Sequence, residues 1–140
     1  MVTVKNLCNE ELPLAKIKEN LEKLLIEKKV DKRVYLYLVD NNEIQRLNKE
    51  FLGKNKPTNV ISFPSDESKI LGEIFISVPY CESEQEETNL ELTELICFYF
   101  IHGLLHLLGY EHVYGGEEEI VMQREQLRLF NIIYPDIEFE

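Results

Sequence analysis

The run HGLLHLLGYEH, at residues 102–112, holds all three histidines of the 140-residue chain, with one glycine between the second and the third. Residues four apart lie on the same face of a helix, so His102 and His106 can bind one ion together. Gly109 can adopt the left-handed conformation that ends a helix, which lets His112 fold back as a third ligand. The run therefore predicts a helix that stops at this glycine and carries a metal site at its end.

Three imidazoles leave one open position on a tetrahedral zinc ion, where catalytic zinc holds a water with a pKa of about 7. We expect one Zn²⁺ with a metal-bound water as the reactive group, and other divalent metals can use the same ligands. Two alternatives stay open: histidines that cluster without a metal, and a closed structural zinc with a thiolate as fourth ligand. Cys97 lies off the histidine face, while Cys8 and Cys81 are remote in sequence.

The histidine spacing is shared with the metzincin protease pattern HExxHxxGxxH. Gly103 stands where such proteases carry the glutamate that acts as general base. A glycine has no side chain to accept a proton, which disfavours the standard peptidase mechanism. The base must then come from elsewhere in the chain. Glu73 is one candidate, although a strand glutamate that faces water is the simpler interpretation.

The length and the 44% hydrophobic residues predict one domain over residues 1–140, with enough apolar material for a core. The most apolar stretch, residues 95–110, is shorter than a membrane span, which indicates a buried helix. The start of the sequence lacks the pattern of a secretory signal, so we expect a cytoplasmic protein with no membrane contact. Three scattered cysteines suggest reduced thiols rather than a disulfide framework.

A net charge of −11 argues against a polyanionic partner, but 12 of the 15 basic residues lie in residues 1–56. A local basic face is possible on an acidic protein because exposed charges are screened within about 8–10 Å. Four of these basic residues are candidates to bind phosphate: Arg46, Lys49, Lys54 and Lys56. The alternative is that they simply belong to a solvated loop. Three polar residues that follow are candidates to line a cleft and bind substrate, or are simply turn residues: Thr58, Asn59 and Ser62.

The hydrophobic periodicity predicts an α/β (α+β) fold with a small mixed sheet of about four strands and about five helices. The expected strands cover residues 2–7, 34–39, 59–63 and 71–77, one of them antiparallel at an edge. The expected helices run from Pro13 towards Lys29, from Asp40 to near Gly53, then to about residue 88, from 90 to 108 and from 117 to 131. In the second helix, Ile44, Leu47 and Phe51 form the expected buried stripe, and Asp40 with Glu43 resembles a capping box.

Three runs resemble the bacterial YbeY-type endoribonucleases, a family associated with maturation of ribosomal RNA and quality control of ribosomes. HGLLHLLGYEH is similar to that family's HGxLHLxGYDH, LNKEFLGKNKPTNVISFP to LNxxxRGKDxPTDVLSFP, and LGEIFIS to LGDIxI. The resemblance covers most of the chain. It implies a metal-dependent endonuclease that cleaves single-stranded or ribosomal RNA, with His102, His106 and His112 as zinc ligands. Ribosomes or ribosome-assembly proteins are the partners it implies.

Leu52 departs from the family pattern, which has an arginine there that is thought to bind substrate phosphate. A leucine donates no hydrogen bond, and Lys54 and Lys56 are the neighbouring cations that could substitute. Asn55 and Glu111 each replace an aspartate of the pattern. Two other functions stay open: a ribosome-assembly factor in which the metal is mainly structural, and another zinc hydrolase such as a peptidase. The sequence predicts no oligomeric state.

Overall fold

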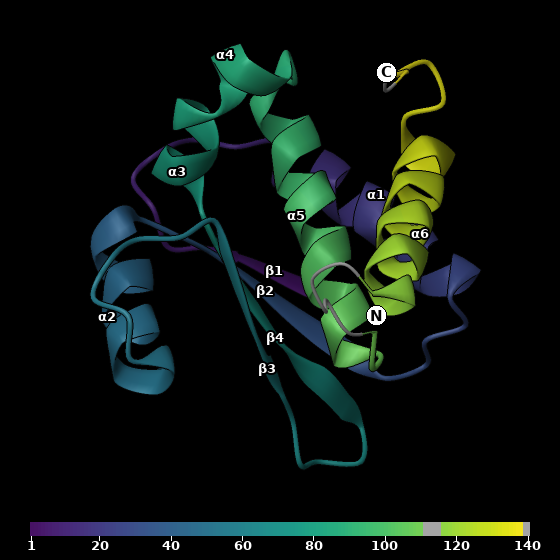
Figure 1. Cartoon of the computed structure of the whole chain (residues 1–140), viewed down its shortest axis with the longest axis horizontal. Coiled ribbons are helices and arrows are strands. Elements are labelled where there is room, and N and C mark those ends of the chain that lie inside the picture. The colour runs from purple at the N-terminus through teal and green to yellow at the C-terminus, as the bar shows by residue number, and fades with distance from the viewer. Residues whose placement is uncertain (111–115, 139–140) are drawn as a thin grey trace.

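The computed structural model describes residues 1–110 and 116–138, which form one α+β domain (Figure 1). The described elements are, in chain order, β1 (Val2–Asn6), α1 (Leu14–Glu27), β2 (Arg33–Val39), α2 (Asn41–Leu52), β3 (Val60–Pro64), β4 (Ile70–Ser77), α3 (Val78–Ser83), α4 (Gln85–Thr88), α5 (Leu92–Leu107) and α6 (Glu117–Ile133). The fold class expected from the sequence is confirmed. Within these residues, no helix has the length and hydropathy of a membrane span.

The four strands form one sheet in the order β1-β2-β4-β3. Strands β1, β2 and β4 are parallel, and β3 runs antiparallel to β4 at the edge, so the predicted antiparallel edge strand is confirmed. Because β4 lies between β2 and β3, the strands that follow one another in the chain are not all neighbours in the sheet.

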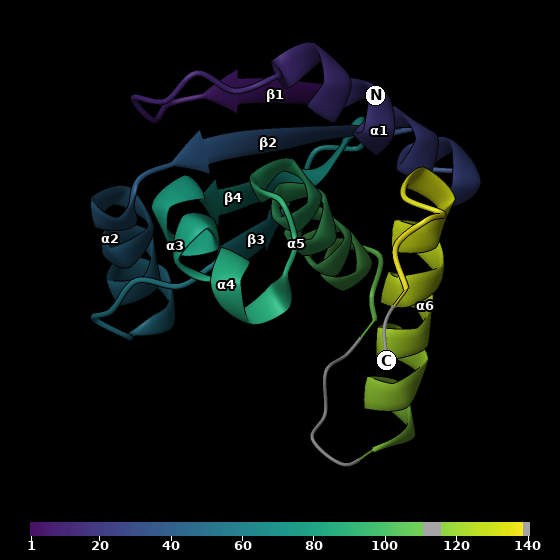
Figure 2. The same cartoon turned by 90° about the horizontal axis from the view of Figure 1, so that it is seen from above.

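Helices α1 and α5 pack on one face of the sheet, α6 packs against both of them, and α2 lies on the other face (Figures 1 and 2). Side chains alternate between the two faces along β2: Leu36 and Leu38 enter the main core, while Val39 faces α2. Helix α5 lies in the middle of the helical layer, so most of its surface is apolar and Phe100 and Leu104 are fully buried. This burial explains why residues 95–110 are so hydrophobic.

Helix α2 begins and ends where the sequence predicts. The carboxylate of Asp40 accepts a hydrogen bond from the backbone N–H of Glu43 at 2.9 Å, and Gly53 adopts a left-handed conformation with a φ of 73°. The Glu43 carboxylate binds Arg46 instead of completing a capping box. The expected burial of Phe51 is wrong: this side chain is 58% exposed, because only the first part of the predicted stripe lies over the sheet.

The segment between β4 and α5 differs from the single helix expected to run to about residue 88. Two short helices, α3 and α4, meet at Glu84, and the chain then turns at Asn89 with a φ of 58°. Helix α5 begins after this turn with a capping box, in which the Glu94 carboxylate accepts from the backbone N–H of Glu91 at 2.8 Å. The end of α5 at Leu107 agrees with the predicted end at 108.

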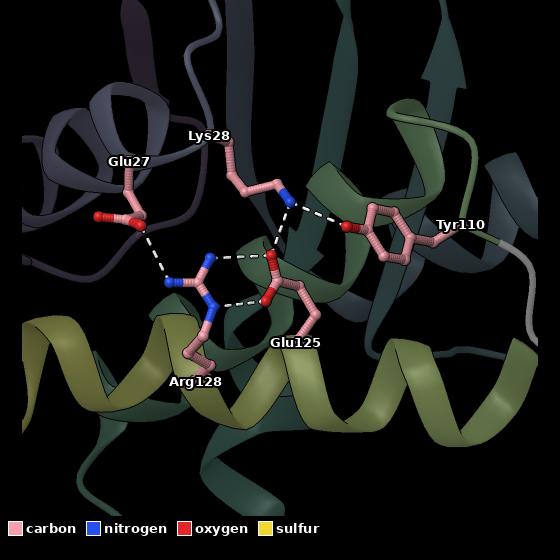
Figure 3. Close-up of polar contacts among 5 residues, drawn as sticks. All are labelled: Glu27, Lys28, Tyr110, Glu125 and Arg128. Carbon is pink, nitrogen blue, oxygen red and sulfur yellow. Dashed lines mark hydrogen bonds and ion pairs between the residues drawn. The ribbon is translucent and has the colours of Figure 1, made fainter.

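A network of charged side chains ties α1 and α6 to the residues that follow α5 (Figure 3). The Lys28 ammonium donates to the Glu125 carboxylate at 2.6 Å and to the Tyr110 hydroxyl at 2.8 Å. Arg128 donates to the same carboxylate at 2.6 Å and to Glu27 at 2.9 Å. Lys28 and Glu125 are largely buried, with 16% and 15% of their side chains exposed, so this pair is less screened than a surface ion pair.

The network shifts the pKa of both Lys28 and Glu125. Burial lowers the pKa of Lys28, but the hydrogen bonds with Glu125 and Tyr110 together outweigh it, so the net shift is upward. The hydrogen bond from Arg128 lowers the pKa of Glu125 to about 2, against the opposing effect of burial and with further help from Lys28. Both groups are therefore charged in the folded protein at neutral pH.

We predict that Glu125→Gln lowers the free energy of unfolding by about 2 kcal/mol at pH 7, because Lys28 loses a buried charged acceptor. Since folding lowers the Glu125 pKa from its ordinary 4.5 to about 2, this stabilisation is complete above pH 4.5 and is lost between pH 4.5 and 2. Urea unfolding at several pH values measures it, and the two proteins should converge in acid. Glu19→Gln is the matched control, because Glu19 is exposed and lies 3.8 Å from its lysine partners. Equal losses in the two variants at pH 7 would contradict the prediction.

Candidate metal centre

His102 and His106 lie on the last turns of α5, one helical turn apart, with their rings side by side. Their Nε2 atoms are 3.1 Å apart, and the ring centroids are 4.6 Å apart with the planes nearly perpendicular. Both residues line the same cleft. The four-residue spacing in the sequence therefore brings two ring nitrogens to one point at the surface of the domain.

These two rings fit a shared metal ion. Two nitrogens bound about 2.05 Å from a tetrahedral zinc ion are separated by about 3.3 Å, close to the distance between the two Nε2 atoms. His112, the expected third ligand, lies outside the described residues, so the three-ligand set stays a prediction. Within residues 1–110 and 116–138, no three histidine, cysteine or acidic side chains converge on one point.

The end of α5 fixes where the chain leaves the two histidines. Gly109 has a φ of 96°, and its N–H donates to the His106 carbonyl at 3.0 Å while the Tyr110 N–H donates to the Leu105 carbonyl at 2.9 Å. This pair of bonds is a Schellman motif, for which glycine is preferred because it has no Cβ to crowd the left-handed backbone. The Lys28 ammonium then holds the Tyr110 hydroxyl, two residues before His112.

A cleft of about 370 Å³ lies beside the two histidines. Helix α5 forms one wall, and the edge strand β3 with the last residue of α2 forms the other. The lining residues are Leu52, Val60, Ile61, Ser62, Pro64, His102, Gly103, His106 and Leu107. The cleft therefore lies between the end of the buried helix and a sheet edge, and Ser62, one of the residues proposed from the sequence to line a cleft, is a polar residue in its wall.

Leu52 is part of this wall and is 55% exposed. The residue that departs from the family pattern therefore stands in the cleft itself, close to the histidines. Among the described residues that line the cleft, none is a lysine or an arginine. A lysine or arginine side chain that stabilises a phosphate here must therefore reach in from outside the described lining.

The four tentative substrate residues, Lys54, Lys56, Thr58 and Asn59, lie on the loop between α2 and β3, next to the described lining but not in it. Buried Asn48 holds this loop, because its side chain donates to the Lys56 carbonyl at 2.9 Å. Both lysine side chains are exposed. A substrate role for these four residues stays a prediction.

Two of the residues proposed from the sequence to contact substrate, Asn59 and Arg46, already have contacts within the protein. The Asn59 side chain accepts from the N–H of Val60 at 2.7 Å, as in a turn. Arg46 pairs with Glu43 at 2.6 Å and with Glu50 at 2.7 Å, which reduces its capacity to bind phosphate. The exposed lysines are the better candidates of the basic segment.

Gly103 lies where α5 packs closely against the sheet. A Cβ on this residue would stand 3.0 Å from Cγ2 of Ile74 and within 3.3 Å of two further atoms of that side chain. Position 103 therefore faces β4, and a glutamate there would be forced against the sheet. The sequence alone shows that a glycine at position 103 cannot act as a general base. The packing against Ile74 adds a steric reason why a glutamate does not fit there, and this reason cannot be read from the sequence.

Glu73 does not reach the cleft. It lies on β4 between Gly72 and Ile74, which face α5, so its side chain is on the opposite face of the sheet. There it neighbours Tyr37, whose pKa is raised by burial and then by the charge of Glu73. None of the described residues that line the cleft is a carboxylate, so the general base is not identified among them.

Two of the cysteines, Cys81 and Cys97, are buried in the core. Burial raises the pKa of Cys81 to about 12 and that of Cys97 to about 11. Neither thiol lines the cleft beside the histidines, which disfavours them as further ligands of a metal bound there. The Cys97 sulfur lies 3.8 Å from the Tyr134 hydroxyl, in the core between α5 and the end of α6.

Comparison with known proteins agrees with this geometry. The family model described as endoribonuclease YbeY matches residues 3–133. An endoribonuclease YbeY from Sulfurihydrogenibium is 37% identical over 91% of this chain and 88% of its own length, and one from Persephonella marina is 40% identical over 84% and 81%. A solution structure of a Thermotoga maritima protein superposes with a TM-score of 0.72 and 29% identity over 97% of this chain and 91% of its own.

The family model and these relatives span nearly the whole domain, including the end of α5 and both walls of the cleft. The chain belongs to the YbeY family of endoribonucleases.

Proposed function

We propose that this protein is a metal-dependent endoribonuclease that cleaves single-stranded RNA during ribosomal RNA maturation, with His102, His106 and His112 as the metal ligands. The observation that carries the proposal is the 3.1 Å separation of the His102 and His106 Nε2 atoms in the wall of a cleft. When bound, a divalent metal such as Zn²⁺ supplies the Lewis acidity that phosphodiester hydrolysis needs. The names of the relatives support RNA as the substrate. Ribosomes or their assembly proteins are the proposed partners.

The residues of the chain itself provide binding and position. The imidazoles of His102 and His106 are held one turn apart by a buried helix, so little ordering is needed when they bind an ion. A cleft of about 370 Å³ leaves room for a phosphodiester and part of the adjoining nucleotides. Ser62 can donate to a phosphate oxygen in this cleft, and Lys54 and Lys56 are the nearest cations outside it in the sequence.

A second candidate function, a ribosome-assembly factor with a mainly structural metal, is favoured by Leu52. Electrostatic stabilisation is usually the largest catalytic contribution, and phosphoryl groups carry negative charge that a cation must offset. An exposed leucine in the wall gives none. The first experiment is therefore cleavage of a short single-stranded RNA by metal-loaded protein, with His102→Ala prepared identically. Cleavage by the unmodified chain alone supports the nuclease, and no cleavage with metal bound supports the assembly factor.

Metal content tests the ligands directly. We predict that His106→Ala loses stoichiometric metal, because two ligands cannot replace the chelation of three. Plasma mass spectrometry after dialysis gives the metal per chain. Ser62→Ala is the control from the same cleft and should keep its metal. The assignment fails if the His106 variant binds as much metal as the unmodified chain.

Restoring the arginine tests whether Leu52 limits the rate. We predict that Leu52→Arg raises kcat/KM for RNA cleavage about tenfold or more, because a fixed guanidinium binds a phosphate with two hydrogen bonds. Leu52→Met is the size-matched neutral control and should leave the rate unchanged. A rate equal to that of the unmodified chain would mean that Leu52 is not a catalytic deficit.

The peptidase alternative is tested by restoring the metzincin glutamate. We predict that Gly103→Glu gives no chelator-sensitive casein hydrolysis and lowers the free energy of unfolding by about 3 kcal/mol, because the new side chain meets Ile74. Urea unfolding and a casein assay measure the two effects. A stable Gly103→Glu variant would contradict the steric prediction, and chelator-sensitive casein hydrolysis by the unmodified chain would favour the peptidase function.

A further inference from the structure

The main-chain groups of β3 are divided between the sheet and the cleft. The strand pairs with β4 on one side only, in a continuous antiparallel register. At one end of this register the Ser77 N–H donates to the Asn59 carbonyl at 3.0 Å. At the other end the Ser65 N–H donates to the Leu71 carbonyl at 3.1 Å. Because hydrogen-bonded pairs alternate with non-bonded ones along an antiparallel ladder, the odd-numbered residues of β3 bond to β4 and the even-numbered ones do not.

The N–H and C=O groups at positions 60, 62 and 64 therefore point away from the sheet, towards the cleft that these residues line. The Val60 N–H is already used, because it donates to the Asn59 side chain at 2.7 Å. Pro64 has no N–H. Within β3, which the structure describes throughout, Ser62 is thus the one residue whose outward N–H is left to bond to another molecule.

The Ser62 side chain lies on the face of the sheet that α5 covers. Side chains alternate along the strand: Val60 packs against the main core, whereas Ile61 belongs to the cluster under α2. Ser62 therefore faces α5, as Val60 does. It stands opposite Ile74, whose side chain packs against Gly103. Ser62 thus lies one strand outward from the point where α5 meets the sheet, and it lines the cleft together with both histidines.

Ser62 brings two hydrogen-bond donors to the cleft, its N–H and its hydroxyl. The residue is half-buried, and its hydroxyl has no hydrogen-bond partner among residues 1–110 and 116–138. Apart from the two histidine rings, every other side chain in the described lining is apolar or is the hydrogen of glycine. Ser62 is therefore the one described lining residue, besides the histidines, whose side chain can donate to a substrate.

This arrangement suits one anionic oxygen better than a peptide strand. A peptide that adds to a sheet edge bonds to the N–H and C=O groups of successive outward residues. Of the three outward positions here, one has its N–H already bonded and one has none. The outward carbonyls along the same edge repel further anionic oxygens. A phosphodiester inside a chain carries one negative charge on two oxygens, so it fits this edge better than a terminal phosphate does.

We propose that the main-chain N–H and the hydroxyl of Ser62 together bind one non-bridging oxygen of the phosphodiester that is cleaved, which rests on the proposed endoribonuclease function. Hydrogen bonds to an ionised acceptor are stronger than those between neutral groups. The N–H is fixed by the strand, so this contact needs little ordering. Ser62 then supplies part of the charge stabilisation that Leu52, in the same wall, cannot give.

Cleavage of a single-stranded RNA decamer by metal-loaded protein tests the contact. We expect Ser62→Ala to lower kcat/KM about tenfold, and Ser62→Thr, which keeps both donors, to recover most of that loss. Ser62→Pro removes both donors and should lower kcat/KM about a hundredfold; an edge strand tolerates proline where the N–H points outward. Circular dichroism and metal content verify that the variants are folded. Ser65→Ala is the matched control, because its hydroxyl accepts from the Glu67 N–H outside the described lining.

Sulfur substitution identifies the oxygen that Ser62 contacts. Once the cleaved linkage of the decamer is mapped, the decamer is made with sulfur in place of either non-bridging oxygen of that linkage, as the separate Rp and Sp forms. Sulfur is a poor hydrogen-bond acceptor, so Ser62→Ala should cost about tenfold with one form and almost nothing further with the other. Equal losses with both forms would overturn the proposal, as would a kcat/KM of Ser62→Ala equal to that of Ser65→Ala.

Binding in chelator distinguishes failure of this contact from failure of the proposed function. The probe is the same decamer labelled with fluorescein, and fluorescence anisotropy gives its affinity for the full chain while a gel verifies that it stays intact. Binding that Ser62→Pro weakens about tenfold, without cleavage by the metal-loaded chain, would support the contact and refute the nuclease. Cleavage with unchanged kcat/KM in Ser62→Ala and Ser62→Pro would keep the nuclease and refute the contact. Absence of both binding and cleavage would refute both.

Discussion

The close packing of α5 against the sheet is the constraint on which the rest of the molecule depends. Gly103 brings the helix so near β4 that a single added carbon would press on Ile74. This contact sets the height of the helix above the sheet, and thereby the direction in which His102 and His106 leave its other side. The apolar residues around α5 hold it between the sheet and α6, so the histidine pair is carried by one of the most buried elements of the domain. A metal site on such a helix is preorganised by the core.

The surface electrostatics suit a protein that handles RNA without attracting it strongly. A net charge of −11 weakens nonspecific attraction to polyanions, and the excess of acid lies in the second half of the sequence. The exposed Lys54 and Lys56 near the cleft are a local exception. Binding of RNA then depends on short-range contacts in and beside the cleft more than on a broad basic surface.

Much of the fold could be predicted because its signals are local. The Asp40 cap, the glycines that end α2 and α5, and the alternation in β2 each depend on a few neighbouring residues. The paired histidines follow from helical spacing in the same way. The apolar stretch from residue 95 to 110 also predicts a buried helix, and Phe100 within it is fully buried.

The features that could not be predicted depend on which strands are neighbours. The contacts of Phe75 on β4 with Tyr37 on β2 and with Phe63 on β3 need β4 to lie between these two strands, an order that differs from the order along the chain. The same topology puts Glu73 on the face away from the histidines, although sequence alone leaves it as a candidate base. Phe51 has helical spacing with Ile44 and Leu47, but the sheet ends before it. In each case tertiary placement decides what a local pattern leaves open.

Strand β3 has one neighbour, β4, so half of its main-chain N–H and C=O groups point away from the sheet. This side of the strand forms a wall of the cleft. Main-chain groups do not change when side chains are substituted, so this wall keeps its donors and acceptors whatever side chain stands at position 60 or 62. Proline is the exception, because it removes the N–H itself. One wall of the cleft thus offers hydrogen-bonding groups whose chemistry is set by the edge position of the strand and not by its side chains.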